Sequence, residues 1–245
     1  MDEHEERPAF YALTGGGWRD YWSLLHPPYT VWHLSYVVIG ACAAPRLHER
    51  WLVETLVAFF LAMGIAAHAL DELHGRPLRT RIPNAVLVGL AVVGLAGAVA
   101  LGIDGAAEVS LWIWAFIAAG LVLVPAYNLE WFGGAVHTDL GFALAWGAFP
   151  ALTAGFAQGG RLTPAIVVAA AGCAALSAAQ RALSTPVRRL RRHVAAVEGV
   201  ILTDEGTSEP LNAAALRAAP EAGLRLLSLA VPLLAAALLV ARLVD

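Results

Sequence analysis

Apolar runs separated by short polar stretches dominate this sequence, and the pattern predicts a bundle of membrane-spanning helices. Each run has roughly the 17 to 25 residues that a helix needs to cross the hydrocarbon core of a bilayer. About seven such spans are predicted, over residues 24–44, 51–70, 84–101, 109–126, 140–157, 163–183 and 223–244. The expected fold class is therefore an all-α, polytopic transmembrane helical bundle.

The polar stretches define the expected domain organisation. Residues 1–23 form a polar lead-in, predicted to be partly disordered, and residues 24–245 form a single transmembrane domain. Within that domain, residues 184–220 are expected to form a hydrophilic cytoplasmic segment.

Composition agrees with this prediction. The chain has 245 residues, of which 59% are hydrophobic and 14% are charged, whereas soluble domains carry about a quarter charged residues. A net charge of −3 gives no sign of a nucleic-acid partner. Both cysteines, Cys42 and Cys173, fall inside apolar runs, where a buried free thiol is expected.

The distribution of arginine predicts the orientation in the cell membrane. Arginines follow the second predicted span and the sixth, and by the positive-inside rule the loops on that side are cytoplasmic. With about seven spans, the N-terminus is then expected on the cytoplasmic side.

The end of the second span carries the first candidate site. His68, Asp71 and Glu72 stand at i, i+3 and i+4, so their side chains are expected on one helical face. Ionisable groups near membrane depth are costly and tend to face a cavity or a partner. Three arginines follow within ten residues and could hold an anion: Arg76, Arg79 and Arg81.

A second polar stretch joins the fourth and fifth spans and is predicted to lie on the same side of the membrane. It contains Glu130 and His137 with a Gly-Gly turn between them. His33, in the middle of the first span, is a further candidate ligand. The arginine-rich run 181–192 could either lie on anionic lipid or bind a substrate phosphate.

Three stretches together resemble the UbiA superfamily of intramembrane prenyltransferases. His26-Pro27 opens the first span, at the place where that family has Arg-Pro. Asp71, together with the arginine-containing segment that follows it and ends in Ile82-Pro83, is similar to the family's first aspartate-rich motif and its trailing arginines. The fifth span, 139–150, is similar to the family's Leu-Gly…Gly-x-x-Pro helix, and Tyr127 precedes it in a loop.

The resemblance implies a metal-dependent enzyme acting on an isoprenoid or other lipid, with prenyl transfer as the expected reaction. In that family, aspartates hold Mg²⁺ ions that bridge a prenyl diphosphate. Carried over to this chain, Asp71 and Glu72, helped by His68, would hold the metal, and the three arginines would bind the headgroup. Tyr127 and Asn128 would orient the acceptor.

This sequence departs from the family pattern in ways that leave two alternatives open. Ala67 and His68 replace an Asn-Asp pair, and the expected second aspartate-rich motif, around residues 180–185, contains no carboxylate. A ligand set of His33, His68, Asp71, Glu72, Glu130 and His137 would suit Zn²⁺, Fe or Mn²⁺ better than Mg²⁺. Such a site predicts oxidation or hydrolysis of a lipid, and the other alternative is a non-catalytic lipid-binding protein.

Overall fold

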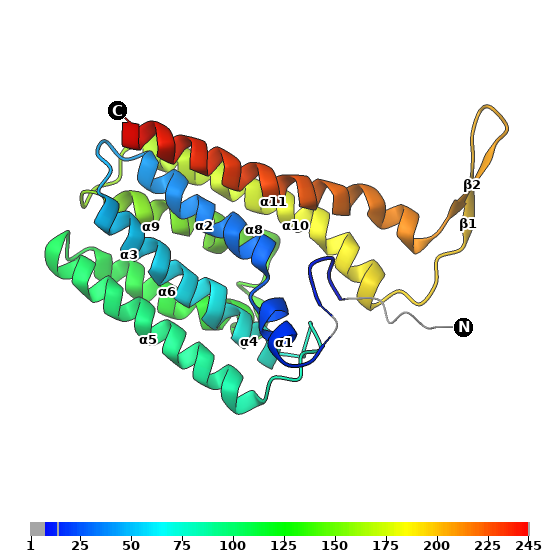
Figure 1. Ribbon diagram of the computed structural model, residues 1–245, viewed down its shortest axis with the longest axis horizontal. Coiled ribbons are helices and arrows are strands. Elements are labelled where there is room, and N and C mark those ends of the chain that lie inside the picture. Colours follow the sequence, from blue (N-terminus) through cyan, green and yellow to red (C-terminus); the bar gives the residue numbers. More distant parts are fainter. Residues whose placement is uncertain (1–7, 14, 245) are drawn as a thin grey trace.

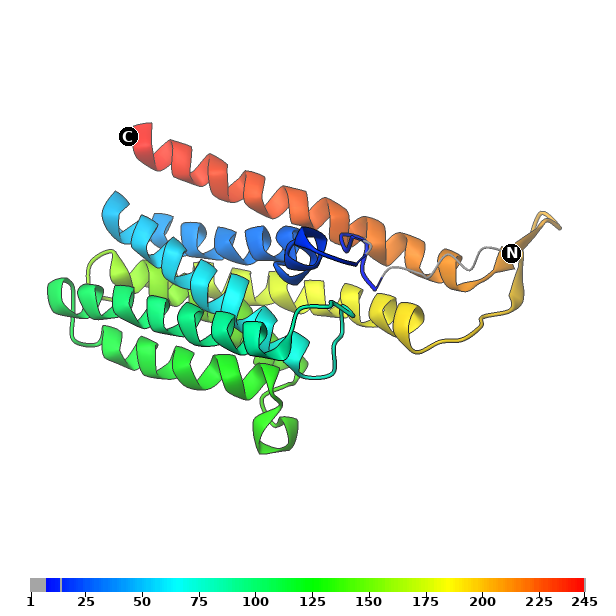
Figure 2. The same ribbon diagram turned by 60° about the horizontal axis from the view of Figure 1, so that its bottom comes forward.

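The computed structural model describes residues 8–13 and 15–244, and 73% of these residues are helical. Long helical rods lie side by side along the length of the molecule (Figures 1 and 2). These rods are α2 (Pro27–Cys42), α3–η1–α4 (Glu49–Phe59, Phe60–Ala67, His68–Leu73), α5 (Asn84–Glu108), α6 (Ile113–Asn128), α8–η2–α9 (Asp139–Phe142, Ala143–Ala148, Phe149–Ala157), α10 (Pro164–Arg192) and α11 (Ala213–Val244).

Five of these rods, in the part of the chain that the structure describes, are long and apolar enough to cross a membrane, and they indicate a multi-pass membrane protein. They are residues 49–73, 84–108, 139–157, 164–192 and 213–244. The other two predicted spans correspond to α2 and α6, which have 16 residues each. At 1.5 Å per residue such a helix is ~24 Å long, shorter than a typical hydrocarbon core.

Two of the rods contain π-helical turns, which the hydropathy pattern did not predict. Segment η1 lies directly before His68, and η2 lies in the middle of the fifth predicted span. Both segments contribute to one buried cluster that includes Met63 and Ala67 from η1 and Trp146 from η2. Because a π-helical turn changes the direction in which the later side chains of its rod point, η1 helps to set which residues of α4 point inward.

Small residues allow the rods to pack closely. A Cβ added at Gly40 of α2 would lie 2.1 Å from the carbonyl oxygen of Ala151 in α9, and one at Gly147 would lie 2.6 Å from the carbonyl oxygen of Cys173 in α10. Helices in lipid associate mainly through such close backbone approaches. These contacts hold α2, α9, η2 and α10 together around the buried Trp32 and Tyr36.

The hydrophilic segment expected at 184–220 is largely regular structure. Helix α10 continues to Arg192 and α11 already begins at Ala213, so the arginines of this segment lie on extensions of two long helices. Arg191 of α10 and Glu221 of α11 pair at 2.5 Å, which ties the extensions together. Between them, strands β1 (Gly199–Leu202) and β2 (Ser208–Leu211) form an antiparallel hairpin that projects from the end of the molecule (Figure 1).

The polar lead-in is also more ordered than predicted over its described residues. Helix α1 (Trp18–Leu24) lies beside α4 at the same end of the bundle (Figure 1), and Asp20 and Ser23 on it are buried. Asp20 accepts a hydrogen bond from the backbone N–H of Arg81, and Ser23 accepts one from that of Leu13. Residues 1–7 of the lead-in lie outside the described part of the chain.

Candidate functional site

A cavity of about 270 Å³, called here the polar cavity, lies at the end of the bundle where α4 and the last turns of α10 meet. Residues from α2, α4, α6, α10 and the segment before α1 line it. The polar and charged side chains of its lining are Tyr11, His26, Tyr29, His33, His68, Asp71, Tyr127, Asn128, His137, Gln180, Arg181, Ser184, Arg188 and Arg192.

His68 and Asp71 of α4 both line the polar cavity, as the spacing of the two residues predicts. The Nδ1 atom of His68 lies 3.1 Å from the carbonyl oxygen of Gly64. Because a carbonyl only accepts, Nδ1 carries the proton and Nε2 is left as an acceptor. The His68 ring also stacks on that of His26, with centroids 4.2 Å apart and planes inclined by 10°.

Glu72 does not lie with them. Its side chain is 1% exposed and accepts hydrogen bonds from the backbone N–H of Leu78 at 3.0 Å and from Thr80 through both N–H at 2.8 Å and Oγ1 at 2.9 Å. Both oxygens of the carboxylate are therefore used by the loop that follows α4. The structure gives Glu72 a role in holding this loop, where the sequence pattern predicted a metal ligand.

The three arginines after α4 also lie outside the lining of the polar cavity. Arg76 donates to the carbonyl oxygens of Thr80 and Ile82 and to the side chain of Asn84, so it braces the loop from within. The backbone of Arg81 is held by Asp20 of α1. The predicted headgroup site at Arg76, Arg79 and Arg81 therefore does not coincide with the polar cavity.

Another set of arginines takes that position. Arg181, Arg188 and Arg192 of α10 line the polar cavity together with Ser184. Their spacing of three, four and four residues puts them on one face of a helix. The sequence carries this signal, since these residues fall within the run 181–192 for which phosphate binding was one of two expectations.

The three guanidinium groups differ in their partners. Arg181 is held by Asp139 at 2.9 Å and donates to the hydroxyl of Tyr127 at 2.9 Å. Arg188 donates only to Thr185 at 3.3 Å within the described chain, and the Nε atom of Arg192 is buried without a hydrogen-bond partner there. The polar cavity therefore holds more positive charge than the carboxylate of Asp71 can balance.

The loop between α6 and α8 reaches the same region. His137 lines the polar cavity, stacks on Tyr127 with centroids 4.5 Å apart, and places Nδ1 3.1 Å from the carbonyl oxygen of Tyr127. Glu130 is half-exposed outside the cavity, 3.7 Å from His137 and 3.9 Å from His74. The two candidate loops thus meet in space, through Glu130 at the surface. Asn128 lines the cavity and donates to the carbonyl oxygen of Val124.

Unpartnered polar atoms also face the polar cavity. His33 and Gln180 are 5% and 3% exposed, and within the described residues neither Nε2 of His33 nor Oε1 of Gln180 has a hydrogen-bond partner. Buried polar atoms in proteins are almost always paired. Since the His33 and Gln180 side chains lie close enough to interact with each other, these two atoms do not by themselves indicate a ligand.

The segment before α1 closes part of the polar cavity. The hydroxyl of Tyr11 and Nδ1 of His26 share a hydrogen bond of 2.7 Å. Burial, and then the nearby His68, lowers the pKa of His26 well below its usual value, while burial raises the pKa of Tyr11. Both groups are therefore neutral near pH 7. Sequence reasoning missed Tyr11, because nothing in residues 1–23 indicates where that segment packs.

The residues at the polar cavity do not fit the metal sites that the sequence suggested. Of the described His, Cys, Asp and Glu side chains, no three gather closely enough to hold a metal ion. Asp71 is the one predicted carboxylate that lines the cavity, since Glu72 serves the loop and Glu130 lies outside. Neither the Mg²⁺ set nor the mixed histidine and carboxylate set is assembled.

An apolar groove adjoins the polar cavity. It has a volume of about 130 Å³, runs between α3–η1, α5, α6 and η2–α9, and shares Met63 and Trp146 with the cavity. From Met63 it extends to Trp51 at the other end of the same rod, a distance of ~18 Å at the rise of an α-helix. Two apolar and aromatic side chains therefore form the boundary between the polar and apolar compartments.

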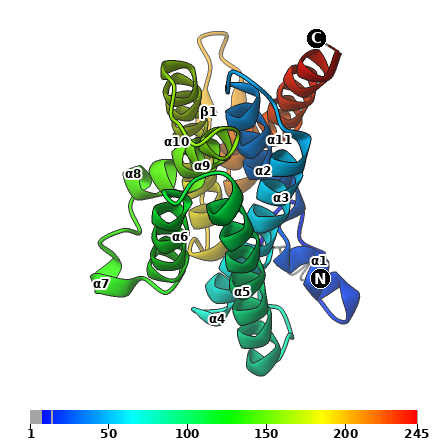
Figure 3. The same ribbon diagram turned by 90° about the vertical axis from the view of Figure 1, so that its left-hand side faces the viewer.

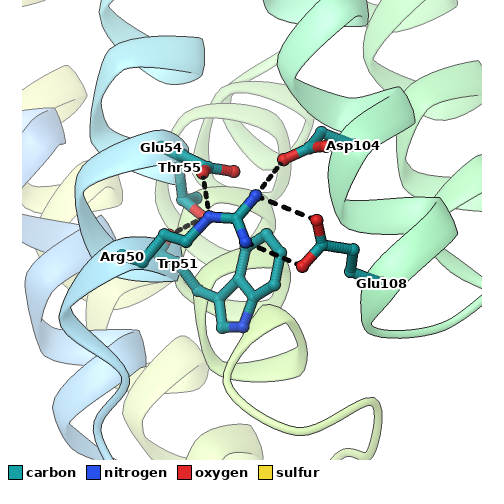
Figure 4. Close-up of polar contacts among 6 residues, drawn as sticks. All are labelled: Arg50, Trp51, Glu54, Thr55, Asp104 and Glu108. Atoms are coloured by element: carbon teal, nitrogen blue, oxygen red, sulfur yellow. Dashed lines mark hydrogen bonds and ion pairs between the residues drawn. The ribbon is translucent and has the colours of Figure 1, made fainter.

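A cluster of charges lies at the far end of the groove (Figure 4). Arg50 pairs with Glu54 at 2.7 Å, Asp104 at 2.5 Å and Glu108 at 2.7 Å, and its guanidinium lies 4.4 Å from the ring centre of Trp51. The cluster joins α3 to α5, and Figure 3 shows these two helices next to each other when the bundle is seen end on.

Comparisons with known proteins add no family to this description. No family model, no curated protein and no solved structure matches the chain.

Proposed function

We propose that this protein is a membrane enzyme that acts on an isoprenoid or related lipid with an anionic headgroup, and that the reaction is prenyl transfer. The observation that carries the proposal is the junction of the polar cavity with the apolar groove at Met63 and Trp146. A charged compartment that adjoins an apolar one across these two side chains matches a ligand with a charged head and a long apolar tail. Soluble substrates would leave the groove without an occupant.

The chemistry of the polar cavity supports a substrate with a phosphate leaving group. In prenyl transfer the C1–O bond of the substrate breaks, and its electron pair leaves with the diphosphate. Guanidinium groups placed at the headgroup stabilise the negative charge that develops there. The acceptor forms a bond to C1 and loses a proton. Asp71 and Nε2 of His68, which both line the cavity, are the candidate bases that accept this proton.

The proposal includes the orientation and the fold type. The end of the bundle that holds the polar cavity also carries the arginines of the loop after α4 and of the last turns of α10, so by the positive-inside rule it faces the cytoplasm. A UbiA-type arrangement is part of the same proposal, supported by Asp71 and the fifth predicted span.

The test is a turnover assay on protein purified in detergent. Tritiated farnesyl diphosphate and an extract of membrane lipids are supplied, and both diphosphate release and a labelled lipid product are measured. We expect turnover by the native protein and at least a hundredfold loss in Asp71→Asn, with full turnover in the matched control Asp204→Asn, whose side chain is exposed in the hairpin turn. Tight binding of farnesyl diphosphate without turnover would indicate a non-catalytic lipid-binding protein instead.

A further inference from the structure

The described lining of the polar cavity does not provide the carboxylates that would hold bridging metal ions, so a diphosphate headgroup would have to be bound by other groups. The second carboxylate motif of the family would fall around residues 180–185, and in this chain Arg181 and Ser184 of α10 stand there and line the cavity. A positive side chain, Arg181, thus stands at the place where carboxylates would recruit positive metal ions. The charge that a diphosphate needs is already present in the protein.

The arrangement of the three guanidinium groups suits an oxyanion. Arg181 is fixed from two sides, by Asp139 and by the Tyr127 hydroxyl, so little side-chain freedom is lost when it binds. Arg188 and Arg192 follow at one-turn spacing from Ser184 along the same face, and within the described chain no carboxylate lies at ion-pair distance from either. A row of guanidinium groups can bind several phosphate oxygens in pairs.

One buried donor atom in this row points to a ligand. The Nε atom of Arg192 has no hydrogen-bond partner in the described chain and no access to solvent, which is costly for a charged donor. The same row faces Asp71 across the cavity, and one carboxylate cannot neutralise it. With Arg181 paired to Asp139, the row keeps one positive charge in excess of Asp71, so an anionic ligand would satisfy both the donor and the charge.

We infer that Arg181, Arg188 and Arg192 bind a phosphate or diphosphate group directly and that this binding needs no divalent metal. The inference rests on the proposed function for the identity of the whole substrate, but it concerns the headgroup alone. The shared chemistry is a phosphate ester oxyanion, which either a prenyl diphosphate or a bilayer phospholipid supplies.

Binding of inorganic pyrophosphate to the full-length protein in detergent tests the inference. Isothermal titration is carried out at constant ionic strength, once with EDTA and once with Mg²⁺. Arg188→Gln and Arg192→Gln are compared with Arg189→Gln, an exposed arginine of the same helix that does not line the cavity. We expect the affinity in EDTA to be at least as high as in Mg²⁺, because Mg²⁺ complexes part of the pyrophosphate in solution. We also expect a loss of about tenfold or more in the first two variants and no change in the third.

The possible outcomes are distinct. Binding that appears only with Mg²⁺, or that is insensitive to both cavity arginines, overturns the inference. If either variant fails to fold, the comparison of EDTA with Mg²⁺ in the native protein still decides it. Displacement of pyrophosphate by micellar phosphatidylglycerol identifies a phospholipid as the source of the group, and displacement by farnesyl diphosphate alone identifies a prenyl diphosphate. Since pyrophosphate has no tail, its binding can succeed even where prenyl transfer fails.

Discussion

Glu72 and Asp71 are adjacent carboxylates to which the structure gives different roles, and substituting them separately tests that assignment. Glu72→Gln keeps the size of the side chain but removes its charge and one of its two acceptor atoms. If the carbonyl oxygen of the glutamine stays with Thr80, its NH₂ group faces the backbone N–H of Leu78, so one bond is lost and two donors oppose each other.

The magnitude follows from these three bonds. A hydrogen bond to a charged group contributes about 1.5 to 3 kcal/mol, and a neutral one about 0.5 to 1.5 kcal/mol. Losing one charged bond removes about 1.5 to 3 kcal/mol, and weakening each of the two others to the neutral range removes about 1 to 1.5 kcal/mol more, so the predicted destabilisation is roughly 3.5 to 6 kcal/mol. With ~2 to 4 °C per kcal/mol for a chain of this length, the melting temperature should fall by roughly 7 to 24 °C. Asp71→Asn should stay within about 1 kcal/mol of the native protein and lose turnover.

Thermal unfolding in detergent, followed by tryptophan fluorescence, measures the effect on stability, and the turnover assay measures function. Glu130→Gln is the matched control, since that carboxylate is half-exposed and should change stability by less than about 0.5 kcal/mol. A Glu72→Gln protein with native stability but no turnover would refute the assignment and return Glu72 to the reaction.

Three further predictions address packing, the groove and pH. Gly40→Ala should destabilise the protein by about 1 to 3 kcal/mol, because the added Cβ meets the backbone of α9. An added Cβ at Gly172 has no atom within 4 Å, so Gly172→Ala should stabilise the protein by roughly 0.5 to 1 kcal/mol. Melting temperatures measure both effects. Gly120→Leu should narrow the apolar groove and lower the affinity for long prenyl chains more than for short ones. An added Cβ there would lie at ordinary contact distance, 3.8 Å, from the ring of Phe149, so the rest of the leucine side chain enters the groove. Equal losses for all chain lengths would contradict a tail site. Because burial lowers the pKa of His26, the unfolded chain binds its proton first, so stability should fall as the pH drops below about 6.5. His26→Asn, which suits the left-handed backbone at this position, should reduce the dependence of the melting temperature on pH between 7.5 and 5.5.

The apolar runs were sufficient to predict the rods of the bundle, but several of their ends were predicted wrongly. A hydropathy pattern ends a span at the first charged residues, while the helix itself continues wherever those charges find partners. The arginines after residue 183 favour helix, and Arg191 is neutralised by Glu221 of the neighbouring rod. The extensions of α10 and α11 therefore depend on a pairing between distant segments that no local pattern contains.

The candidate site was predictable in part. Helical spacing correctly placed His68 and Asp71 together, but it could not show that the following loop needs the carboxylate of Glu72 for its own N–H groups. The face formed by Arg181, Arg188 and Arg192 could have been found by applying the same spacing argument to α10. The contribution of Tyr11 could not, because it comes from tertiary packing of the lead-in segment.

Equilibrium binding of tritiated farnesyl diphosphate to the detergent-purified protein, with EDTA present, shows whether one lipid occupies both compartments. We expect saturable binding to the native protein. We expect weaker binding both in Arg192→Gln, which alters the polar cavity, and in Gly120→Leu, which alters the groove. Absence of saturable binding, or binding that neither substitution changes, would contradict the claim that cavity and groove together hold one amphipathic lipid.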